Sequence, residues 1–157
     1  MDSNNNYEER NQTTENYAET ICEEHYENKG YLTKMGFNEK KSMIPSEIFW
    51  KIPSTIRNIP DYLCVGTKVK FIEVKGFKET LKIKLDDLLA YEFWNNIQFT
   101  NLCFFVVDCE TNIKYELDYY QLKQLISSDD TITSKYWDNK KVYFEIKKEK
   151  LEYYEVK

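Results

Sequence analysis

The chain has 157 residues, the length of one ordinary domain, and 41% of them are hydrophobic, so wholesale disorder is excluded. No stretch approaches the roughly 20 apolar residues that cross a bilayer, and the amino terminus lacks the apolar core of a signal peptide. We therefore expect a cytoplasmic protein (in the host cytoplasm if the chain is viral) with no membrane partner. The formal net charge of the chain is −5.

The amino-terminal segment begins polar and then becomes helical. Residues 1–12 are Asn-rich with nothing to bury, and we interpret them as a flexible tail. Thr13 or Thr14 can cap a helix that runs to about Asn28, because apolar residues recur on one face at helical spacing. Gly30 stands just past its end, where a left-handed stop is expected.

A long irregular connection separates this helix from two strands. Residues 31–37 are predicted to form a short strand or an extended segment. Residues 38–60 contain all three prolines, which predicts a loop with one helical turn at 46–50. A connection this long is often functional. Strand patterns follow over 62–65 and 68–74, and the Gly-Thr pair between them favours a tight turn.

The second half of the chain alternates helix and strand. A helix is predicted over 85–97, with one side made by Leu85, Leu88, Leu89, Phe93 and Asn96. The run at 102–107 is apolar throughout, as in a strand buried on both faces. The remaining predictions are a strand at 113–117, a helix from the cap Asp118 through Ile126, and hairpin or edge strands at 142–146 and 151–156. This order predicts an α/β fold, a central mixed β-sheet flanked by helices, in a single domain over 13–157.

The scarcity of histidine and the scatter of cysteine exclude several kinds of site. The four cysteines have no CxxC spacing, and there is one histidine, His25. A structural zinc site needs clustered thiolates or imidazoles, and Ser-His-Asp or Cys-His catalysis would have to use His25. We interpret the cysteines as buried free thiols and expect carboxylates and lysines to carry any chemistry.

One pair of carboxylates is placed to meet across a hairpin. Asp61 begins the first strand and Glu73 lies near the end of the second, so an antiparallel turn brings them together. Two adjacent acids repel each other unless a cation lies between them, and Mg²⁺ suits oxygen ligands. Lys75 leaves the strand on the same face as Glu73, where it can act on a water or stabilise phosphate charge. Gly76 lets another backbone approach closely.

The Glu-x-Lys string alone is weak evidence for an active site. Glu145-Ile146-Lys147 is a second instance, and a surface ion pair at a strand end would give the same string. The combination is more specific. Pro60-Asp61 lies one hairpin's length before the Glu-x-Lys string, an apolar strand leads into Glu73, and glycine follows Lys75. This combination resembles the PD-(D/E)xK nuclease superfamily, which includes restriction endonucleases and Holliday-junction resolvases.

The resemblance implies a restriction-endonuclease-like core and a metal-dependent endonuclease that hydrolyses DNA phosphodiester bonds, structure-selective and of phage or mobile-element type. The implied cofactor is Mg²⁺ or Mn²⁺. The alternative is a nuclease-fold module without catalysis that binds DNA or a protein partner.

The resemblance also implies a set of ligands and a catalytic residue. Lys75 would act on the water. Among the helical acids, Glu19 lies at the expected distance from a Gly-aromatic pair, although Glu15 and Glu23 stand one turn away on either side. The implied metal ligands are Asp61, Glu73, the backbone carbonyl of Val74 and Glu19.

Basic residues near the motif are candidates for DNA contacts. Residues 29–84 carry a net charge of +7, against −7 over 1–28 and −5 over 85–157. A basic middle third can face phosphate, although solvated lysines would give the same pattern. The candidates are Arg57 and Lys51, with Lys40 and Lys41, on the long connection, and Lys82 and Lys84 before the next helix. Equally, that connection can simply cover the core with Phe49 and Trp50.

Two further points concern the mode of action. Some exonucleases of the superfamily place a glutamine and a tyrosine on the helix after the motif. Here Tyr91 has no such glutamine before it, which argues against exonuclease chemistry of that type. Cutting both strands of a duplex takes two active sites, so a homodimer is an alternative to a monomer.

Overall fold

The structure, a computed structural model, describes residues 3–37, 43–135 and 140–157. Its helices are α1 (Ser3–Tyr26), α2 (Ser46–Phe49), α3 (Ser54–Arg57), α4 (Leu85–Asn95) and α5 (Tyr119–Ile126). Its strands are β1 (Tyr31–Lys34), β2 (Tyr62–Val65), β3 (Val69–Phe77), β4 (Thr80–Lys84), β5 (Asn101–Asp108), β6 (Lys114–Asp118), β7 (Ile132–Lys135), β8 (Val142–Lys147) and β9 (Glu155–Val156). Two 3₁₀ turns, η1 (Lys148–Lys150) and η2 (Glu152–Tyr154), precede β9.

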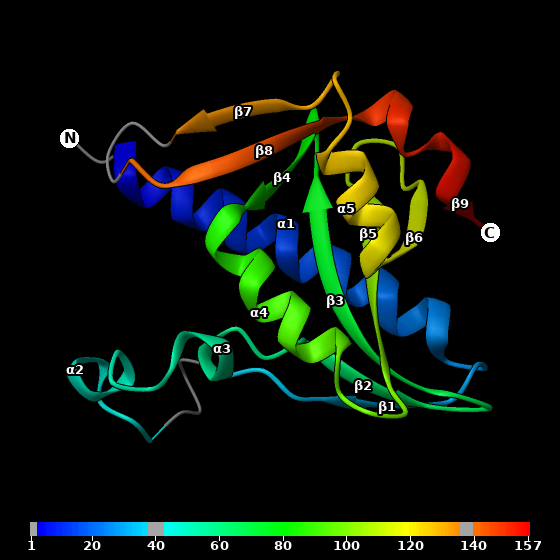
Figure 1. The fold of residues 1–157 in the computed structure, drawn as a ribbon, viewed down its shortest axis with the longest axis horizontal. Coiled ribbons are helices and arrows are strands. Elements are labelled where there is room, and N and C mark those ends of the chain that lie inside the picture. Colours follow the sequence, from blue (N-terminus) through cyan, green and yellow to red (C-terminus); the bar gives the residue numbers. More distant parts are fainter. Residues whose placement is uncertain (1–2, 38–42, 136–139) are drawn as a thin grey trace.

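A six-stranded mixed sheet organises the fold. Its strand order is β1-β2-β3-β5-β6-β9, and a second sheet of order β4-β8-β7 lies beside it (Figure 1). β3 and β5 pair in parallel, because the chain crosses over between them through β4 and α4. The other pairs are antiparallel. The expected fold class, α/β with a central mixed sheet flanked by helices, is confirmed.

The central strands send alternate side chains to two cores. On one face Ile72 of β3 and Phe105 of β5 pack with Cys22 of α1. On the other face Phe71 and Phe104 pack with residues of α4, α5 and the second sheet. The six-stranded sheet is therefore a middle layer, with α1 crossing one face and α4 and α5 on the other (Figure 1).

Several predicted elements are confirmed. β2 has the predicted limits, and β5 is buried from Leu102 to Asp108, as expected of a strand covered on both faces. Asp118 caps α5 in a reciprocal arrangement. Its side chain accepts a hydrogen bond from the Gln121 backbone N–H, and the Gln121 side chain accepts one from the Asp118 backbone N–H. The helical turn expected near residues 46–50 is α2.

Other predictions are wrong. α1 begins at Ser3 and not after a cap at Thr13 or Thr14, because extending an existing helix costs less than nucleating one. Gly30 has a φ of +156°, which side chains rarely allow, but it lies four residues past Tyr26, where α1 ends, so it does not stop the helix. A Cβ there would lie 2.9 Å from the Val65 carbonyl oxygen, so this glycine allows the chain to pass close to the β2–β3 turn. β4, β7 and α3 were not predicted. Within residues 151–156, expected as a strand, Glu152–Tyr154 form a 3₁₀ turn and only Glu155–Val156 form a strand, the edge strand β9.

The inner face of α4 also differs from the predicted one. Leu85, Leu89 and Phe93 are exposed, whereas Ala90, Tyr91 and Trp94 are buried. Apolar residues lie around most of this helix, so periodicity does not select the face. Polar bonds settle the packing: the Tyr91 hydroxyl donates to Glu73, and the Trp94 indole N–H donates to the Thr55 carbonyl.

The cysteines and tyrosines serve the cores. All four cysteines are free, and Cys22, Cys64 and Cys103 are buried, as expected. Tyr115 and Tyr119 are buried as well. Within the described ranges, none of the helices combines the length and apolar character that crossing a bilayer requires.

Gly76 on β3 is a point of close approach between the sheet and α1. A Cβ at this position would lie 2.8 Å from the Thr14 carbonyl oxygen and 3.1 Å from the Cys109 sulfur. Gly76→Ala should therefore overpack the contact and lower the free energy of unfolding by about 1–3 kcal/mol, measured by urea denaturation. Gly36→Ala is the control, because a Cβ there meets nothing within 4 Å. Equal midpoints for the two variants would contradict the close approach.

Candidate active site

The β2–β3 hairpin brings Asp61 and Glu73 together. Tyr62 pairs with Ile72 in the hairpin, which places Asp61 beside Glu73 one residue further along. The Val74 backbone N–H donates to Asp61 Oδ2 over 2.7 Å, so the end of β3 holds this carboxylate. The two acids come from adjacent strands and line the same cavity.

Glu73 is buried and has two polar neighbours. Lys75 Nζ lies 3.0 Å from Glu73 Oε1, and the Tyr91 hydroxyl donates to the same oxygen over 3.2 Å. The Lys75 ammonium also lies 5.8 Å from the centre of the Tyr91 ring. The strand period of two puts Glu73 and Lys75 on the face that α4 covers, and this is why Tyr91 meets both.

These residues line a cavity of about 610 Å³ between α1, α4 and the segment that carries α2 and α3. The carboxylates on its wall are Glu15, Glu19, Asp61, Glu73 and Asp87. Its cations are Arg57 and Lys75, and its aromatic residues are Phe37, Phe49, Trp50 and Tyr91. The cavity is therefore acidic where the hairpin, α1 and α4 line it, and aromatic along the α2 segment.

Burial and mutual repulsion oppose ionisation of the acid pair. Burial, followed by the charge of Glu73, raises the pKa of Asp61 to about 8, although the Val74 N–H and Lys75 act in the opposite direction. Burial also raises the pKa of Glu73, against the opposing effect of Lys75. The pair is thus a site at which a cation would be stabilising.

Lys75 is poised as a charged group. Burial disfavours its ammonium, but the Tyr91 oxygen and the Glu73 carboxylate outweigh burial and hold the pKa of Lys75 well above its ordinary value. A protonated lysine donates hydrogen bonds and stabilises negative charge, and it does not take up a proton. Of the two roles expected from the sequence, this state favours charge stabilisation.

The helical acids differ in their surroundings. Glu15 and Glu19 line the cavity, and Glu19 Oε2 accepts from Lys34 Nζ over 2.8 Å. Glu23 instead accepts from the Tyr62 hydroxyl over 2.7 Å and is not on the cavity wall. Of the three acids left open by the sequence, Glu15 and Glu19 therefore share a cavity with the acid pair.

The donor set at the hairpin fits a hard divalent cation. Mg²⁺ is commonly held by one or two carboxylates together with waters and substrate phosphate, and Asp61 and Glu73 supply two such groups. Within the described part of the chain, no three His, Cys, Asp or Glu side chains lie close enough together to hold a metal ion. The third acid, from α1, therefore stands back from the pair in this structure, with Glu19 bound to Lys34.

The predicted DNA contacts fall in different places. Arg57 lines the cavity, where its guanidinium lies 4.7 Å from the centre of the Trp50 ring. Lys51, Lys82 and Lys84 are exposed and do not line it. Lys82 lies on β4 in the second sheet, 4.0 Å from Glu145. Lys40 and Lys41 lie outside the described residues.

The structure adds residues that the sequence did not single out. Asp87 stands one helical turn before Tyr91 on the inner face of α4, and both line the cavity. Their spacing of four residues was the available signal. Phe37 and Trp50 complete the opposite wall, and only the three-dimensional path of the long connection brings them there.

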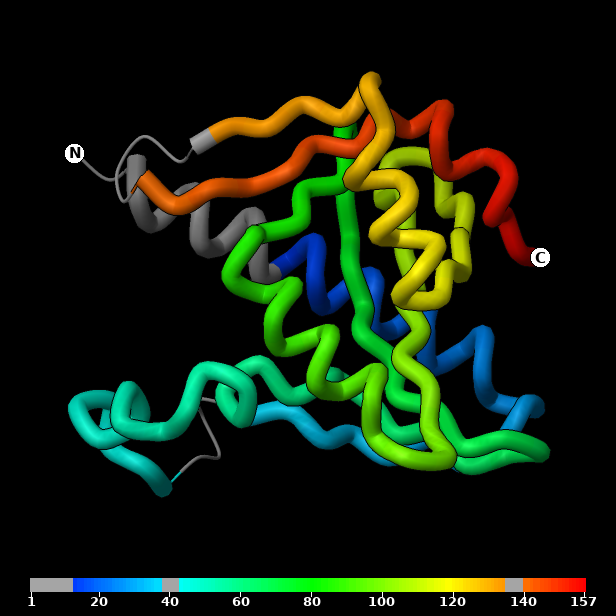
Figure 2. The backbone as a smooth tube through the Cα atoms, in the orientation of Figure 1, coloured from blue at the N-terminus to red at the C-terminus, as the bar shows by residue number. Residues whose placement is uncertain are grey.

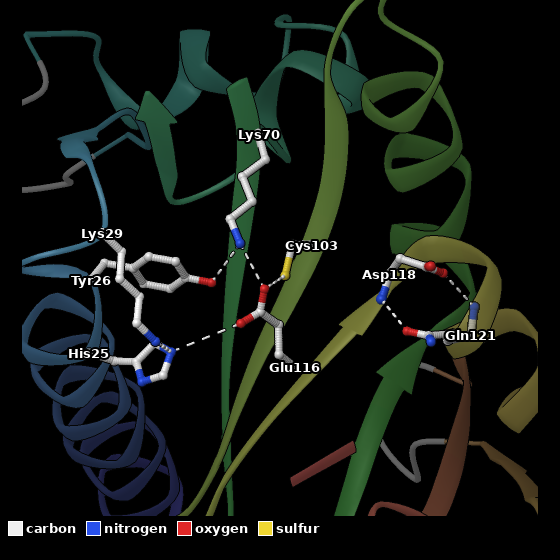
Figure 3. A network of polar contacts seen from close by, with 8 residues as sticks. All are labelled: His25, Tyr26, Lys29, Lys70, Cys103, Glu116, Asp118 and Gln121. Carbon is white, nitrogen blue, oxygen red and sulfur yellow. Dashed lines mark hydrogen bonds and ion pairs between the residues drawn. The ribbon is translucent and has the colours of Figure 1, made fainter. Parts of the chain in front are cut away.

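A second polar cluster lies away from this cavity and is structural (Figure 3). Lys70 Nζ donates to Glu116 Oε1 over 2.7 Å and to the Tyr26 hydroxyl over 3.0 Å. The Cys103 thiol donates to the same Glu116 oxygen. Burial and the Glu116 charge raise the pKa of the Cys103 thiol well above its ordinary value, which keeps the thiol protonated. The cluster ties α1 to β3, β5 and β6.

The fold defines a mixed α/β protein with a carboxylate-lined cavity at the end of a hairpin. No family model and no curated protein matches the sequence. Among solved structures, the chain is similar to one described as "Structure of D212, a nuclease from a fusselovirus". The TM-score is 0.51 with 8% sequence identity, over 89% of this chain and 83% of that one. The two chains therefore share a fold, and the low sequence identity supports no statement beyond the fold.

The raised pKa of Asp61 makes stability depend on pH in the metal-free protein. Between its ordinary pKa near 4 and about 8, the folded state holds a proton that the unfolded chain has lost. Stability in EDTA should therefore fall as pH rises through this window. Asp61→Asn removes the titrating group, so its urea midpoint should fall less than that of the wild type between about pH 5 and pH 8.

Asp129→Asn is the matched control, because Asp129 is exposed and lies outside the cavity. This variant should keep the wild-type dependence on pH. Parallel curves for wild type and Asp61→Asn would show that Asp61 is ionised in the folded protein across the whole range.

Proposed function

We propose that the protein is a metal-dependent endonuclease that hydrolyses DNA phosphodiester bonds, of the PD-(D/E)xK type that its sequence resembles. The observation that carries this proposal is the acid pair Asp61 and Glu73, held in one cavity with Lys75 in contact with Glu73. The fold shared with a structure described as a viral nuclease supports it. The proposal includes structure-selective cleavage and a phage or mobile-element setting.

The chain's own residues would divide the work among them. Asp61 and Glu73 would hold Mg²⁺ or Mn²⁺, with the Val74 carbonyl and an acid of α1, Glu19 or Glu15. When bound, the ion supplies an activated water and stabilises charge on the phosphate. The Val74 N–H fixes Asp61 in place, and Tyr91 orients Glu73.

Lys75 would supply positive charge to the phosphate. Its ammonium pairs with Glu73 in this structure, so a cation at the acid pair would release it toward substrate. A preorganised positive charge in a buried site stabilises the negative charge that develops in the transition state.

Cleavage of a duplex on both strands would need two such sites, which a homodimer would supply. Sedimentation of the purified chain with and without duplex DNA measures this directly. A monomer would restrict the proposal to cuts on one strand.

The cleavage test uses labelled linear, nicked, branched and single-stranded DNAs in Mg²⁺, Mn²⁺ or EDTA. Wild type should cut at least one of them only with metal. Asp61→Ala and Glu73→Ala should each lower the rate by at least about 100-fold, since even residues that only support metal ligands cost roughly 10- to 100-fold. Lys75→Ala should lower it by about 100-fold or more.

Glu145→Ala is the matched control, because Glu145-Ile146-Lys147 repeats the Glu-x-Lys string on β8 of the second sheet, outside the cavity. This variant should cut as the wild type does. Equal activity in all four variants would remove the assignment, and DNA binding without cleavage under every metal would leave a binding module.

Metal binding can be tested without any substrate. Mg²⁺ or Mn²⁺ should raise the melting temperature at pH 8, because the ion binds the folded state and relieves the repulsion of the acid pair. Asp61→Asn should lose this shift, and Lys75→Ala should keep it. A shift that survives in Asp61→Asn would place the ion elsewhere.

A further inference from the structure

The aromatic wall of the cavity, which is Phe37, Phe49, Trp50 and the guanidinium of Arg57, has no role in the chemistry above. Phe49 contacts Phe37 at 5.6 Å and Trp50 at 5.7 Å between ring centres, both edge to face. Arg57 lies over the Trp50 ring and is fixed by a hydrogen bond from its Nε to the Ile52 carbonyl oxygen. The four groups therefore form a continuous ladder along one side of the cavity.

The outer rung of this ladder faces solvent. Trp50 lines the cavity yet remains 68% exposed, and Phe37 is 39% exposed. If the connection only covered the core, its tryptophan would be turned inward. The segment that carries α2 and α3 instead extends out from the body of the fold, with α3 against α4 and α2 farther out (Figures 1 and 2). Exposed aromatic side chains at the mouth of a cavity mark a binding surface.

Charge separates the two sides of the cavity and selects the occupant. The hairpin, α1 and α4 carry the five carboxylates, which repel a phosphate except where a cation offsets them. The ladder carries no acid and one cation, Arg57. A nucleotide matches both sides at once, with its uncharged base against Trp50 and its phosphate toward Arg57 and Lys75.

The same geometry favours unpaired over paired nucleotides as occupants of the cavity. In a duplex each base stacks on its neighbours, so its face is not available to an indole ring. A cavity of about 610 Å³ lies within the roughly 300–1,000 Å³ of small-molecule pockets. This size suits one or two nucleotides and is too small for the width of a duplex.

We propose that this ladder stacks the base of an unpaired nucleotide, so that the substrate of the acid pair is DNA with a single-stranded segment at the cavity. The substrate assignment rests on the proposed nuclease function. The stacking itself can be tested without cleavage. Trp50 is the residue that confers the preference.

The experiment measures binding of the full chain by fluorescence anisotropy in Ca²⁺, which takes the same oxygen ligands as Mg²⁺. The probes are a labelled single strand and a blunt duplex of equal length. Trp50→Ala should weaken binding to the single strand about tenfold, as expected for loss of one stacked base, and binding to the duplex less than about twofold. Trp50→Phe should restore affinity, because a phenyl ring still stacks.

The matched control is Tyr153→Ala, which removes an aromatic side chain that is 88% exposed on η2, outside the cavity. It should bind both probes as the wild type does. A second signature comes from tryptophan fluorescence. The single strand should quench it in the wild type, and this quenching should be much reduced in Trp50→Phe although binding persists.

Three results would overturn the inference. They are unchanged binding in Trp50→Ala, equal losses on both probes, and a change of oligomeric state in Trp50→Ala, which would make the ladder a contact between two copies. None of these depends on turnover. A protein that shows the selective loss but never cuts DNA would retain the stacking wall and lose the nuclease function.

Discussion

The site depends on the forced proximity of two carboxylates, of which Glu73 is buried and Asp61 is half-buried. Backbone pairing of β2 with β3, not attraction between side chains, sets Asp61 beside Glu73. Burial, followed by repulsion from Glu73, raises the pKa of Asp61, and the fold bears the cost of both. Sheet pairing is extensive, and the strand β3 that carries Glu73 is held between β2 and β5. A rigid frame can therefore hold an arrangement that isolated side chains would avoid.

Three neighbouring groups donate hydrogen bonds to the acid pair. Lys75 and Tyr91 both contact Glu73 through the same oxygen, and the Val74 N–H contacts Asp61. Each donates a hydrogen bond to a carboxylate, and the Lys75 ammonium is an internal counter-ion of the pair.

The hairpin could be predicted from the sequence because its determinants are local. Turn residues, alternation and the two-residue period fix which side chains share a face, and these place Asp61, Glu73 and Lys75 correctly in space. The cap of α5 was predictable for the same reason, since Asp118 and Gln121 are three residues apart. The buried strand β5 was predictable from an unbroken apolar run.

Features that depend on distant segments could not be predicted. Tyr91 rather than Leu89 turns inward because Glu73, from another element, accepts its hydroxyl. The sequence does not distinguish Glu23 from Glu19 as a metal ligand. The difference arises from Tyr62, a distant residue whose hydroxyl donates a hydrogen bond to Glu23. Trp50 reached the cavity through the path of an irregular connection, for which no periodic pattern exists. β7 is a short strand of the second sheet with little alternation of its own. β4 does alternate, with Leu81 and Ile83 buried between exposed lysines, but its five residues lie directly between β3 and α4 and were not separated from them in the sequence.

The position of that connection has an evolutionary consequence. The aromatic ladder lies between β1 and β2, whereas the acid pair and Lys75 lie on the hairpin itself. A surface connection tolerates insertion and substitution better than a strand at the centre of a sheet does. If the ladder selects the substrate as proposed, a related chain could acquire another preference through changes in the segment ahead of β2. The pairing of β2 with β3, and with it the position of the acid pair, would be inherited unchanged.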